Sequence, residues 1–481
     1  MKIYNTLTRQ KQNFTPITPN TVKMYTCGQT VYNNIHMGNA RFYVVYDAIR
    51  RYLEHCGYTV EYVQNFTDID DKTIARANEE GISPTQIAEK YIASTLQDLE
   101  NLNIKAATVN PRVTQEIPAI VEMVAGLVNT NHAYEKGGTV YFDITSFPQY
   151  GKLSHRNIED LEAGARVEVE ADKKNPADFV LWKPAKPGEP SWPSPWGNGR
   201  PGWHIECSAM IRKYLGDEID IHGGGTDLIF PHHENEIAQT EALTDKNLAR
   251  YWMHCGMITV DHKKMSKSRG NFATLQEVAE KYPYDVIRFF FLSVHYRMPM
   301  EFTDVALNAA QQGLQRIKNC YNNLEHLLST GPPVITDERT RFIGTENNRD
   351  RVVLKIELLP SYNAFFNAMD NDFNTADAIT AIFELVKHIN ILPSSTLPLE
   401  LYELQNHLVK LMGILGINLK DNVANSSSDS EEDENIEALI TARQTARKNK
   451  DFAESDRIRD ELANMGIVLE DTREGVRWHR A

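Results

Sequence analysis

The sequence is poor in cysteine, and it lacks any long apolar run. Among its 481 residues there are five cysteines, scattered along the chain and odd in number. A disulfide framework is therefore not expected, and the chain is predicted to be cytoplasmic. No stretch of about 18 apolar residues could span a bilayer, and none near the first residue has the form of a signal peptide, so no membrane association is expected.

Basic residues are fewer than acidic ones. The 51 lysines and arginines stand against 65 aspartates and glutamates, which gives a formal net charge of −14. This balance argues against a general nucleic-acid coat protein, but RNA binding through a local basic surface stays possible because phosphate contacts depend on local charge. The hydrophobic content of 41% is ordinary for a globular protein, and the length predicts two to four domains.

The N-terminal part of the chain predicts an α/β nucleotide-binding fold. A strand is expected over Lys23–Gly28, a helix with one apolar face over Asn39–Cys56, and an alternating strand over Tyr58–Phe66. Strand, helix and strand in this order indicate a right-handed unit of a parallel sheet. Such sheets bind nucleotides at the first strand-to-helix turn, which is where His36 and Asn39 fall.

Changes of composition divide the rest of the chain. Glycine-containing, acidic and proline-rich stretches indicate an insertion that splits the nucleotide-binding fold, and later helical patterns indicate a separate helical bundle. An acidic, low-complexity linker, expected to be disordered, precedes a small terminal module. The predicted domains are the first half of the α/β fold (1–110), the insertion (111–202), the second half (203–250), a lysine-containing loop region (251–304), the bundle (305–424), the linker (425–435) and the C-terminal module (436–481).

Two cysteines, a histidine and a glutamate form a candidate metal site. His232 and Glu236 are four residues apart on one predicted helix and share a face, while Cys27 and Cys207 fall where a parallel sheet opens its ligand crevice. Thiolate, imidazole and carboxylate ligands together suit Zn²⁺. Inert buried thiols are the commoner explanation of free cysteines, no CxxC pair joins two of these ligands, and His233 competes with His232 as the partner of Glu236.

Two familiar motifs are incomplete in this sequence. His233-Glu234 begins an HExxH pattern, but Ile237 occupies the place of the second histidine, which argues against a zinc hydrolase. The glycine run of residues 222–227 is not a Walker loop, because no Lys-Ser/Thr pair closes it. Its glycines favour close backbone approach to a ligand, or a plain tight turn.

A lysine-containing segment is a second candidate for phosphate binding, besides the turn at His36. Lys264-Met265-Ser266-Lys267-Ser268 concentrates positive charge in a predicted loop, which suits transient contact with a polyphosphate. Far upstream, residues 31–41 open a helix with an imidazole, a glycine and an amide. In this order and separation, the two segments resemble the paired ATP signatures of class I aminoacyl-tRNA synthetases.

Over essentially its whole length, the sequence resembles one family of that class, the cysteinyl-tRNA synthetases. The resemblance is carried by Met24–Gly28, Asn65–Lys72, Gly202–Met210, Phe230–Glu236 and Lys264–Ser268. It implies a Rossmann-like catalytic domain split by a connective insertion, then an α-helical bundle that binds tRNA and a small anticodon-binding module. It also implies one zinc ion per chain, with His232 rather than His233 as the imidazole ligand. The complete implied ligand set is Cys27, Cys207, His232 and Glu236.

The resemblance implies a reaction in two steps. L-cysteine is activated with ATP, accompanied by Mg²⁺, to cysteinyl-adenylate, and the cysteinyl group then passes to the 3′ end of tRNA(Cys). Zinc is expected to bind the substrate thiolate and so to distinguish cysteine from serine, which a pocket alone separates poorly. A separate editing domain is then unnecessary.

Site residues are also implied by the resemblance. The catalytic and ATP-binding assignments are His36, Asn39, Gly224, Asp227, Lys264 and Lys267. The amino-acid pocket is assigned to Thr67, Trp203 and His222, for which ordinary core packing is the alternative. Asn39 stands where the signature often has a second histidine; an amide still donates hydrogen bonds but carries no charge, so a change of emphasis is expected rather than loss of activity.

The C-terminal module is the expected site of anticodon contact. Arg443, Arg447, Lys448 and Lys450 predict a basic face, and Trp478 could stack on an unpaired base; a solvated helix face and a frayed tail are the alternatives. A monomer is expected because no dimer stripe is present. Two rival functions are a ligase that joins cysteine to an amino sugar, which would lack this module, and a non-catalytic tRNA-binding protein, which would leave Lys267 unexplained.

Overall fold

A four-stranded parallel sheet lies within the larger of two compact units of the chain, Met1–Leu419, and Lys420–Ala481 forms the smaller. The computed structural model describes residues 1–156, 173–260, 263–264, 273–330, 359–393, 395–420, 429–449, 451–472 and 475–480. The sheet has the order β10-β9-β3-β4. Its strands are β3 (Thr21–Thr26), β4 (Thr59–Gln64), β9 (Ile219–Gly225) and β10 (Ala249–Cys255). Every pairing between them is parallel, which confirms the predicted α/β sheet.

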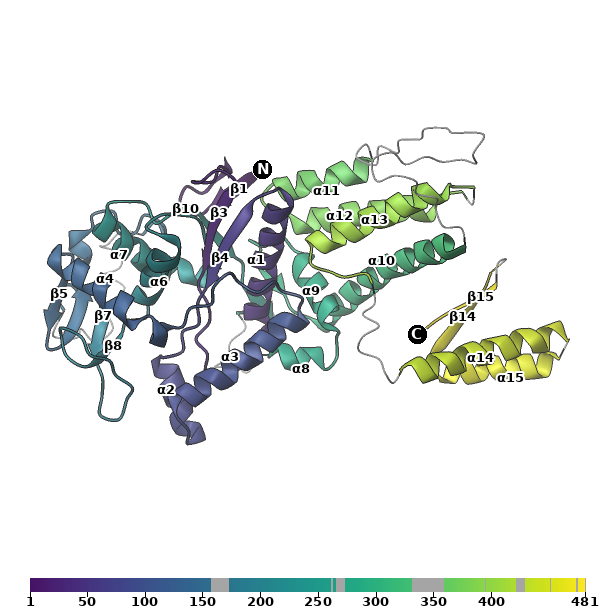
Figure 1. Ribbon diagram of the computed structural model, residues 1–481, viewed down its shortest axis with the longest axis horizontal. Helices are drawn as coiled ribbons and strands as arrows, with labels where there is room; N and C mark the ends of the chain where they lie inside the picture. The colour runs from purple at the N-terminus through teal and green to yellow at the C-terminus, as the bar shows by residue number, and fades with distance from the viewer. Residues whose placement is uncertain are drawn as a thin grey trace. The chain divides into compact units, whose positions relative to one another are not determined.

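Helices cover both faces of this sheet (Figure 1). On one face lies α1 (Met37–His55), whose apolar residues share a core with Met24 of β3. On the other lie α6 (Ile205–Leu215) and α7 (Glu234–Thr244), whose core includes Tyr25. Neighbouring residues of β3 serve different cores because side chains alternate between the two faces of a strand.

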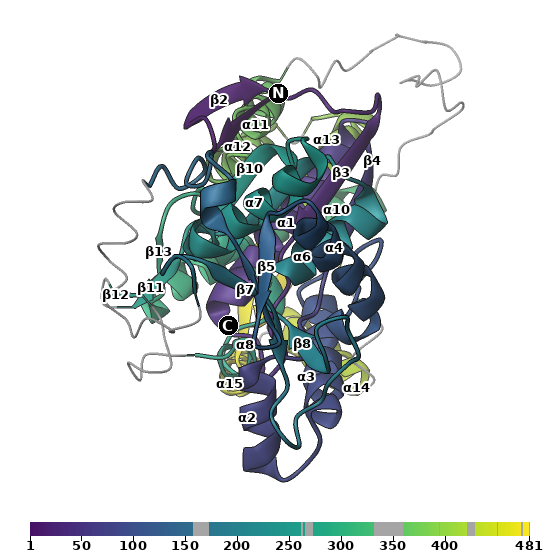
Figure 2. The same cartoon turned by 90° about the vertical axis from the view of Figure 1, so that its left-hand side faces the viewer.

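In the sequence, an antiparallel sheet is inserted between the two halves of the parallel sheet. Figure 2 views the larger unit from the side on which this antiparallel sheet lies. Its strand order is β5-β6-β7-β8, and Phe142 and Trp182 pack in the same core as α6 and α7. The bounds are α2 (Asp71–Glu80), α3 (Pro84–Asn101), η1 (Val113–Gln115), α4 (Ile117–Asn129), β5 (Ala133–Lys136), β6 (Thr139–Phe142), η2 (Ile144–Ser146), β7 (Phe179–Pro184) and β8 (Gly199–Pro201). The insertion thus adds to the apolar core that lies between the parallel sheet and helices α6 and α7.

The helical bundle predicted after residue 305 is present, but it is not separate from the nucleotide-binding part. Residues of the bundle and of α1 belong to one apolar core, because α1 buries side chains on nearly all its sides and so faces both the sheet and the bundle. The helices of this region are α8 (Leu275–Ala279), α9 (Tyr284–Leu292), α10 (Asp304–Thr330), α11 (Pro360–Asp370), α12 (Thr375–Asn390) and α13 (Pro398–Ile414).

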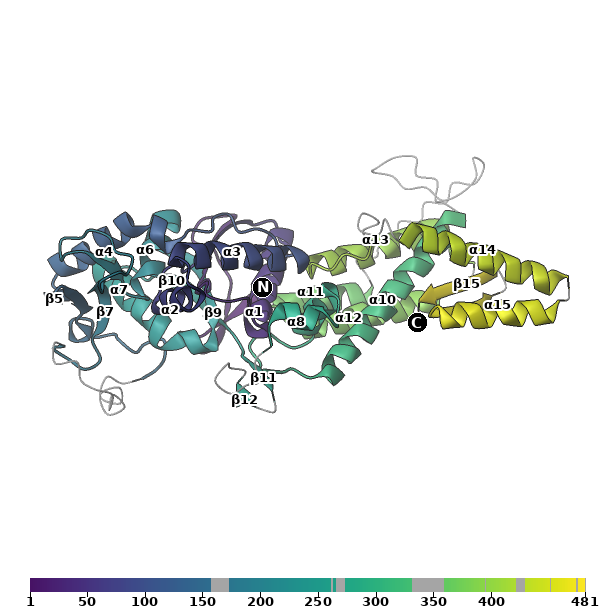
Figure 3. The same ribbon diagram turned by 90° about the horizontal axis from the view of Figure 1, so that it is seen from below.

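Two small sheets complete the larger unit. β1 (Lys2–Asn5) and β2 (Gln10–Asn13) form a hairpin. β11 (Ile258–Val260), β12 (Lys263–Lys264) and β13 (Met300–Glu301) form a second sheet in the order β12-β11-β13, which Figure 3 shows at its lower edge. Among the described residues, no helix has the length and apolar character needed to cross a membrane.

The smaller unit contains two helices and a hairpin. Its core consists of apolar residues from both helices together with Ile467. The elements are α14 (Asp429–Lys448), α15 (Phe452–Asn464), β14 (Ile467–Thr472) and β15 (Gly475–Arg480). The helix predicted from Ile436 begins earlier, within the acidic stretch that was expected to be disordered; acidic residues favour a helix start because they complement the partial positive charge there. Residues 425–428 of that stretch lie outside the described residues.

Candidate functional site

The predicted metal ligands converge where the strands of the parallel sheet end. Cys27 directly follows β3, and Cys207 lies in the first turn of α6. His232 lies in a short π-helical turn, η4 (Ile229–His233), that leads into α7, and Glu236 lies in the first turn of α7. The crevice at the carboxyl ends of parallel strands is the usual ligand site of such folds, so the sheet topology brings together residues that are far apart in the sequence.

The ligand atoms of Cys27, Cys207, His232 and Glu236 all lie within 4.8 Å of one another, and all four residues are buried. Glu236 Oε1 is 2.9 Å from His232 Nε2 and 3.3 Å from Cys27 Sγ, and His232 Nε2 is 3.6 Å from Cys207 Sγ. A tetrahedral zinc ion, with bonds of about 2.0–2.3 Å, needs ligand atoms roughly 3.3–3.8 Å apart. Small adjustments of these side chains would meet that requirement, so the donor set fits zinc.

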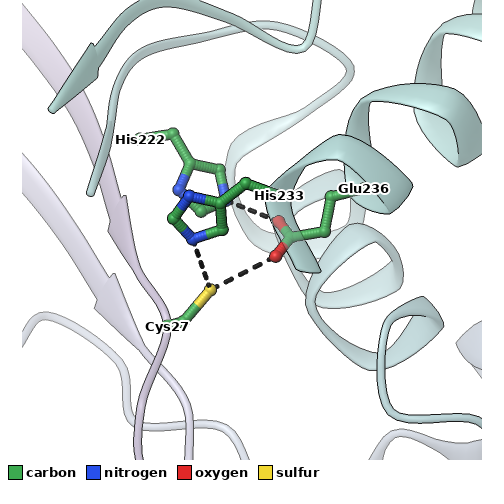
Figure 4. Close-up of side chains that lie close together, drawn as sticks. All are labelled: Cys27, His222, His233 and Glu236. Carbon is green, nitrogen blue, oxygen red and sulfur yellow. Dashed lines mark hydrogen bonds and ion pairs between the residues drawn. The ribbon is translucent and has the colours of Figure 1, made fainter. Parts of the chain in front are cut away.

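A second possible ligand set overlaps the first (Figure 4). Cys27, His222, His233 and Glu236 also place their ligand atoms within 4.8 Å of one another. Cys27 Sγ lies 3.4 Å from His233 Nε2, and His222 Nε2 lies 2.5 Å from Glu236 Oε2. Both sets share Cys27 and Glu236. The geometry alone therefore leaves the competition between His232 and His233 open.

The two thiols differ in acidity. A hydrogen bond with Cys27 and the nearby His232 lower the pKa of the Cys207 thiol to about 6, whereas burial raises the pKa of Cys27 well above its usual value. Burial alone would lower the pKa of His232, but the carboxylate of Glu236 and the thiol of Cys207 raise it to about 10. A metal ion that binds such a cluster displaces the protons of its thiols and imidazole.

Three histidines outside the first ligand set contact candidate ligands of one set or the other. His222, predicted as a wall of the amino-acid pocket, contacts Glu236 and stacks on the ring of Trp252 with centroids 4.5 Å apart. His204 Nδ1 lies 2.9 Å from His232 Nδ1, and His254 Nε2 lies 2.8 Å from Nδ1 of the neighbouring histidine, residue 233. Contacts of this kind orient metal ligands. His204 and His254 were not predicted, because no local spacing relates them to the residues they contact.

The other two predicted residues of the amino-acid pocket lie beside Cys207 and His232. Trp203 is 43% exposed, and its ring centroid lies 4.4 Å from that of His232, so the residue lies at the solvent side of the cluster. Thr67 is buried, and its hydroxyl donates to Glu206 Oε2 at 2.9 Å. Glu206, which was not predicted, has a pKa raised well above its usual value by burial and by the neighbouring Cys207 thiol.

His36 and Asn39 form the start of α1. His36 is the N-cap residue: its Nδ1 accepts the backbone N–H of Asn39 at 3.2 Å, and Asn39 Oδ1 accepts the N–H of His36 at 3.4 Å. This reciprocal capping box fixes both side chains at the positive end of the helix. Glycine is required between them, because a Cβ at Gly38 would lie 2.8 Å from the His36 ring. The helix start is thus a suitable place for phosphate groups.

The glycines at the end of β9 admit side chains of the protein itself. A Cβ at Gly223 would lie 2.3 Å from the ring of Tyr46, and one at Gly224 would lie 2.3 Å from the ring of His233. The sequence had suggested a ligand, or a tight turn, as the reason for these glycines. Asp227 follows in η3 (Thr226–Leu228) and is exposed.

The lysine-containing segment is described in part. Lys264 belongs to β12, where its backbone pairs with Thr259 of β11. Lys267 lies outside the described residues. Where the chain is described again, Ala273 accepts the N–H of Met37 at 3.2 Å, so this segment returns to the start of α1. The chain that follows the second predicted ATP segment therefore lies beside the first one.

The basic face predicted on the smaller unit is only partly present. Arg447 and Lys448 are exposed on α14, but Arg443 is buried, with 6% of its surface exposed, so its predicted place on that face is wrong. It lies on the side of α14 that carries the core residue Ile440. Lys450 lies outside the described residues. Trp478 belongs to β15, where its backbone pairs with Leu469, rather than to a frayed tail.

Comparison with known families covers most of the chain. A family model described as "tRNA synthetases class I (C) catalytic domain" matches residues 13–312. Models described as "DALR domain" and "Cysteinyl-tRNA ligase anticodon binding domain" match residues 364–420 and 429–478. The three matches follow one another along the sequence without overlap.

Similar proteins share the whole length of the chain. The cysteine–tRNA ligases of Lachnospira eligens and Clostridioides difficile are 52% and 50% identical to it over 492 and 481 residues, and each comparison covers 100% of both proteins. Among solved structures, methionyl-tRNA synthetase of Mycobacterium tuberculosis, in complex with methionyl-adenylate, has a TM-score of 0.59 at 15% identity, covering 82% of this chain and 89% of that one. A LeuRS–tRNA–LeuAMS complex from Agrobacterium radiobacter has a TM-score of 0.62 at 11% identity, covering 85% of each chain. These structures share the fold.

Proposed function

The chain belongs to the cysteine–tRNA ligase family of class I aminoacyl-tRNA synthetases, and we propose that it joins L-cysteine to tRNA(Cys) at the carboxyl ends of its parallel strands. The observation that carries this proposal is a buried cluster of two thiols, an imidazole and a carboxylate at the end of β3, the strand from which the chain runs on to the helix start that carries the first ATP signature. A thiol-selecting site and a phosphate-binding site are the two things that activation of cysteine requires.

One zinc ion is proposed at Cys27, Cys207, His232 and Glu236. When bound, zinc supplies a soft acceptor that prefers a thiolate to a neutral hydroxyl, which separates cysteine from serine where shape alone does not. His204 orients His232 through the 2.9 Å contact between their Nδ1 atoms. The pocket around the rest of the amino acid is proposed to include Thr67, Trp203 and His222.

Adenylate formation depends on placing groups rather than on covalent catalysis. The carboxylate of cysteine attacks the α-phosphate of ATP, pyrophosphate leaves, and negative charge spreads over the phosphate oxygens during the step. His36 and Asn39 are proposed to face these oxygens from the start of α1, where the helix end is partly positive. Lys264 and Lys267, together with Mg²⁺, are proposed to supply charge from the other side. Gly224 and Asp227 are proposed to contact the adenosine.

The remaining parts are proposed to hold the tRNA. The bundle of residues 305–424 and the terminal module of residues 436–481 would contact the tRNA and read its anticodon, with residues 425–435 between them. The catalytic part is proposed to comprise residues 1–110 and 203–250, the connective insertion 111–202 and the lysine-containing region 251–304. The enzyme is proposed to act as a cytoplasmic monomer.

Pyrophosphate exchange tests the proposed reaction directly. Exchange of labelled pyrophosphate into ATP should depend on cysteine and should not occur with serine, and the same sample should contain about one zinc ion per chain, as a four-ligand site requires. Charging of tRNA(Cys) with labelled cysteine then tests the acceptor. Well-folded, zinc-containing protein that shows no exchange would contradict the proposal and favour a non-catalytic tRNA-binding role.

A further inference from the structure

Arg41 is a fully buried cation on α1 that contacts backbone rather than acidic side chains. Its relative exposure is 0%, and its guanidinium donates to the carbonyl oxygens of Gly256 at 2.9 Å, Met257 at 3.4 Å, His295 at 3.3 Å and Met298 at 2.8 Å. Among the described residues, no carboxylate lies within ion-pair distance of it. Its Nε has no hydrogen-bond partner, and burial lowers the pKa of the side chain.

A charge in this position is unfavourable for stability taken alone. Removing a cation from water without a counter-ion costs several kcal/mol, and an apolar side chain of similar length would fill the same volume. What the guanidinium adds is a planar set of donors that joins two chain segments, residues 256–257 and 295–298. The segments approach closely: a Cβ at Gly256 would lie 2.4 Å from the carbonyl oxygen of Met298.

These two segments are the roots of β11 and β13. Gly256 donates to the carbonyl of Tyr296 at 2.8 Å, and Met300 donates to that of Met257 at 3.0 Å. The pairing continues between β11 and β13 and then from β11 to β12, which carries Lys264. The position of the Lys264 backbone relative to α1 therefore depends on the point where Arg41 holds both roots.

The chain that is described again from Ala273, after the lysine-containing segment, is also attached to α1. Met37 donates to Ala273 at 3.2 Å, and Leu275 donates to Ile35 at 2.9 Å. These two bonds flank His36, the N-cap of the helix. Arg41 thus holds the chain before the lysine-containing segment, and the start of α1 holds the chain after it.

We propose that Arg41 is a positioning residue for adenylate formation. It fixes the chain segments that lead into β11 and β13, and through them β12 with Lys264, to the helix that presents His36 and Asn39. The inference rests on the proposed function, since it assigns both sets of residues to ATP. A planar guanidinium fixes four carbonyls at once, so small displacements of these strands are resisted. Misplacement of reacting groups by about 1 Å can lower a rate about 100-fold.

The test replaces Arg41 by Lys and uses Arg288 as a matched control. Arg288 is equally buried, at 1%, and also donates to backbone carbonyls, those of Leu102 and Leu415. Each Arg→Lys variant keeps the charge but loses the planar set of donors. Arg41→Lys should lower kcat of cysteine-dependent exchange by about 10- to 100-fold and weaken ATP affinity measured by calorimetry, with zinc content and the KM for cysteine unchanged. Arg288→Lys should lower the unfolding temperature and leave the kinetics of exchange unchanged.

The outcomes separate this inference from the proposed function. Absence of exchange in the unsubstituted enzyme would contradict the proposed function, while ATP affinity still reports on Arg41. If Arg41→Lys has the ATP affinity of the unsubstituted enzyme, or loses zinc and cysteine affinity together with activity, Arg41 is a structural residue and the inference is wrong. It is also wrong if the two variants change exchange equally.

Discussion

At the scale of single residues, Cys207 distinguishes the two possible ligand sets, because it belongs to one of them and not to the other. If Cys27, Cys207, His232 and Glu236 hold the metal, Cys207→Ala should reduce the zinc content of the purified protein well below one ion per chain. Loss of a thiolate removes one of four bonds from a tetrahedral site. Zinc is quantified by atomic emission on each variant.

The control for this prediction is Cys320→Ala, which removes an equally buried thiol of α10 outside both sets. It should keep its zinc. If Cys207→Ala retains zinc while His233→Ala loses it, the alternative set of Cys27, His222, His233 and Glu236 holds the metal.

Which of these residues the sequence could predict follows from the range of the interactions. His232 and Glu236 share a helix face by their spacing, and Cys27 ends a strand, so local patterns place them. The contacts of His254 with His233 and of His204 with His232 join different elements, and no local pattern records them. The close approach of the His233 ring to Gly224 also joins distant elements and was not predicted, while the contact of Gly224 with ATP stays a prediction.

At the scale of elements, a buried ion pair joins α1 to α9. Asp47 of α1 contacts Arg288 of α9 and lies 2.7 Å from Arg51. Burial alone would raise the pKa of Asp47, but these two arginines lower it overall. Because its pKa is lower in the folded than in the unfolded chain, ionised Asp47 stabilises the fold above the ordinary aspartate pKa of about 3.9, and this contribution is lost as the pH falls further.

Asp47→Asn should therefore destabilise the larger unit by about 3–5 kcal/mol near pH 7, since it leaves Arg288 buried without a counter-ion. The difference from the unsubstituted protein should narrow as the pH is lowered below about 4. Urea unfolding at a series of pH values measures both effects. Glu54→Gln, in a more exposed pair with Arg50, is the control and should change stability by about 1 kcal/mol or less. A difference that is constant with pH would argue against the pair.

Helix α1 also shows why the bundle, which the sequence had predicted to be separate, is not separate from the nucleotide-binding part. The helical spacing of Asn39–Cys56 predicted one apolar face. Tyr46 does meet the sheet, since its hydroxyl donates to the carbonyl of Met253, but Tyr52 donates to Asp370 of α11, so the helix also packs against the bundle. Tyrosines are compatible with a solvent-facing or a buried side, and the sequence pattern does not choose between them.

At the scale of the whole molecule, the two units have their own cores, and their functions should be separable. A chain ending at Leu419 should keep cysteine-dependent pyrophosphate exchange, because every proposed ATP and zinc residue precedes that point. Its kcat/KM for charging tRNA(Cys) should fall by at least about 10-fold, which corresponds to 1.4 kcal/mol of lost tRNA interaction. Both rates are measured on the same preparation.

The matched comparison for the truncation is a full-length chain with Arg447→Ala and Lys448→Ala, two exposed basic residues of α14. It should show part of the charging defect and normal exchange. Charging by the truncated chain at the rate of the full chain would remove the smaller unit from tRNA recognition. The helices of this unit were predictable from their periodicity, whereas β15 was missed because its sequence has no clear strand pattern and it is a strand through its pairing with β14.

The pairing of Met24 in β3 with Ile221 in β9 has a consequence for how the protein is made. During synthesis, β3 and β4 emerge together with α1, but their neighbour in the sheet is translated only after the whole insertion. Closing so long a loop is slow, although its entropic cost grows only by about 0.6 kcal/mol with each doubling of length. The parallel sheet and the cluster around Cys27 therefore cannot be completed until the ribosome has passed Glu236. Until then one edge of the sheet is unpaired and Cys27 lacks its partners. Uptake of the proposed metal ion at the complete site would consequently be a late event in the synthesis of the chain.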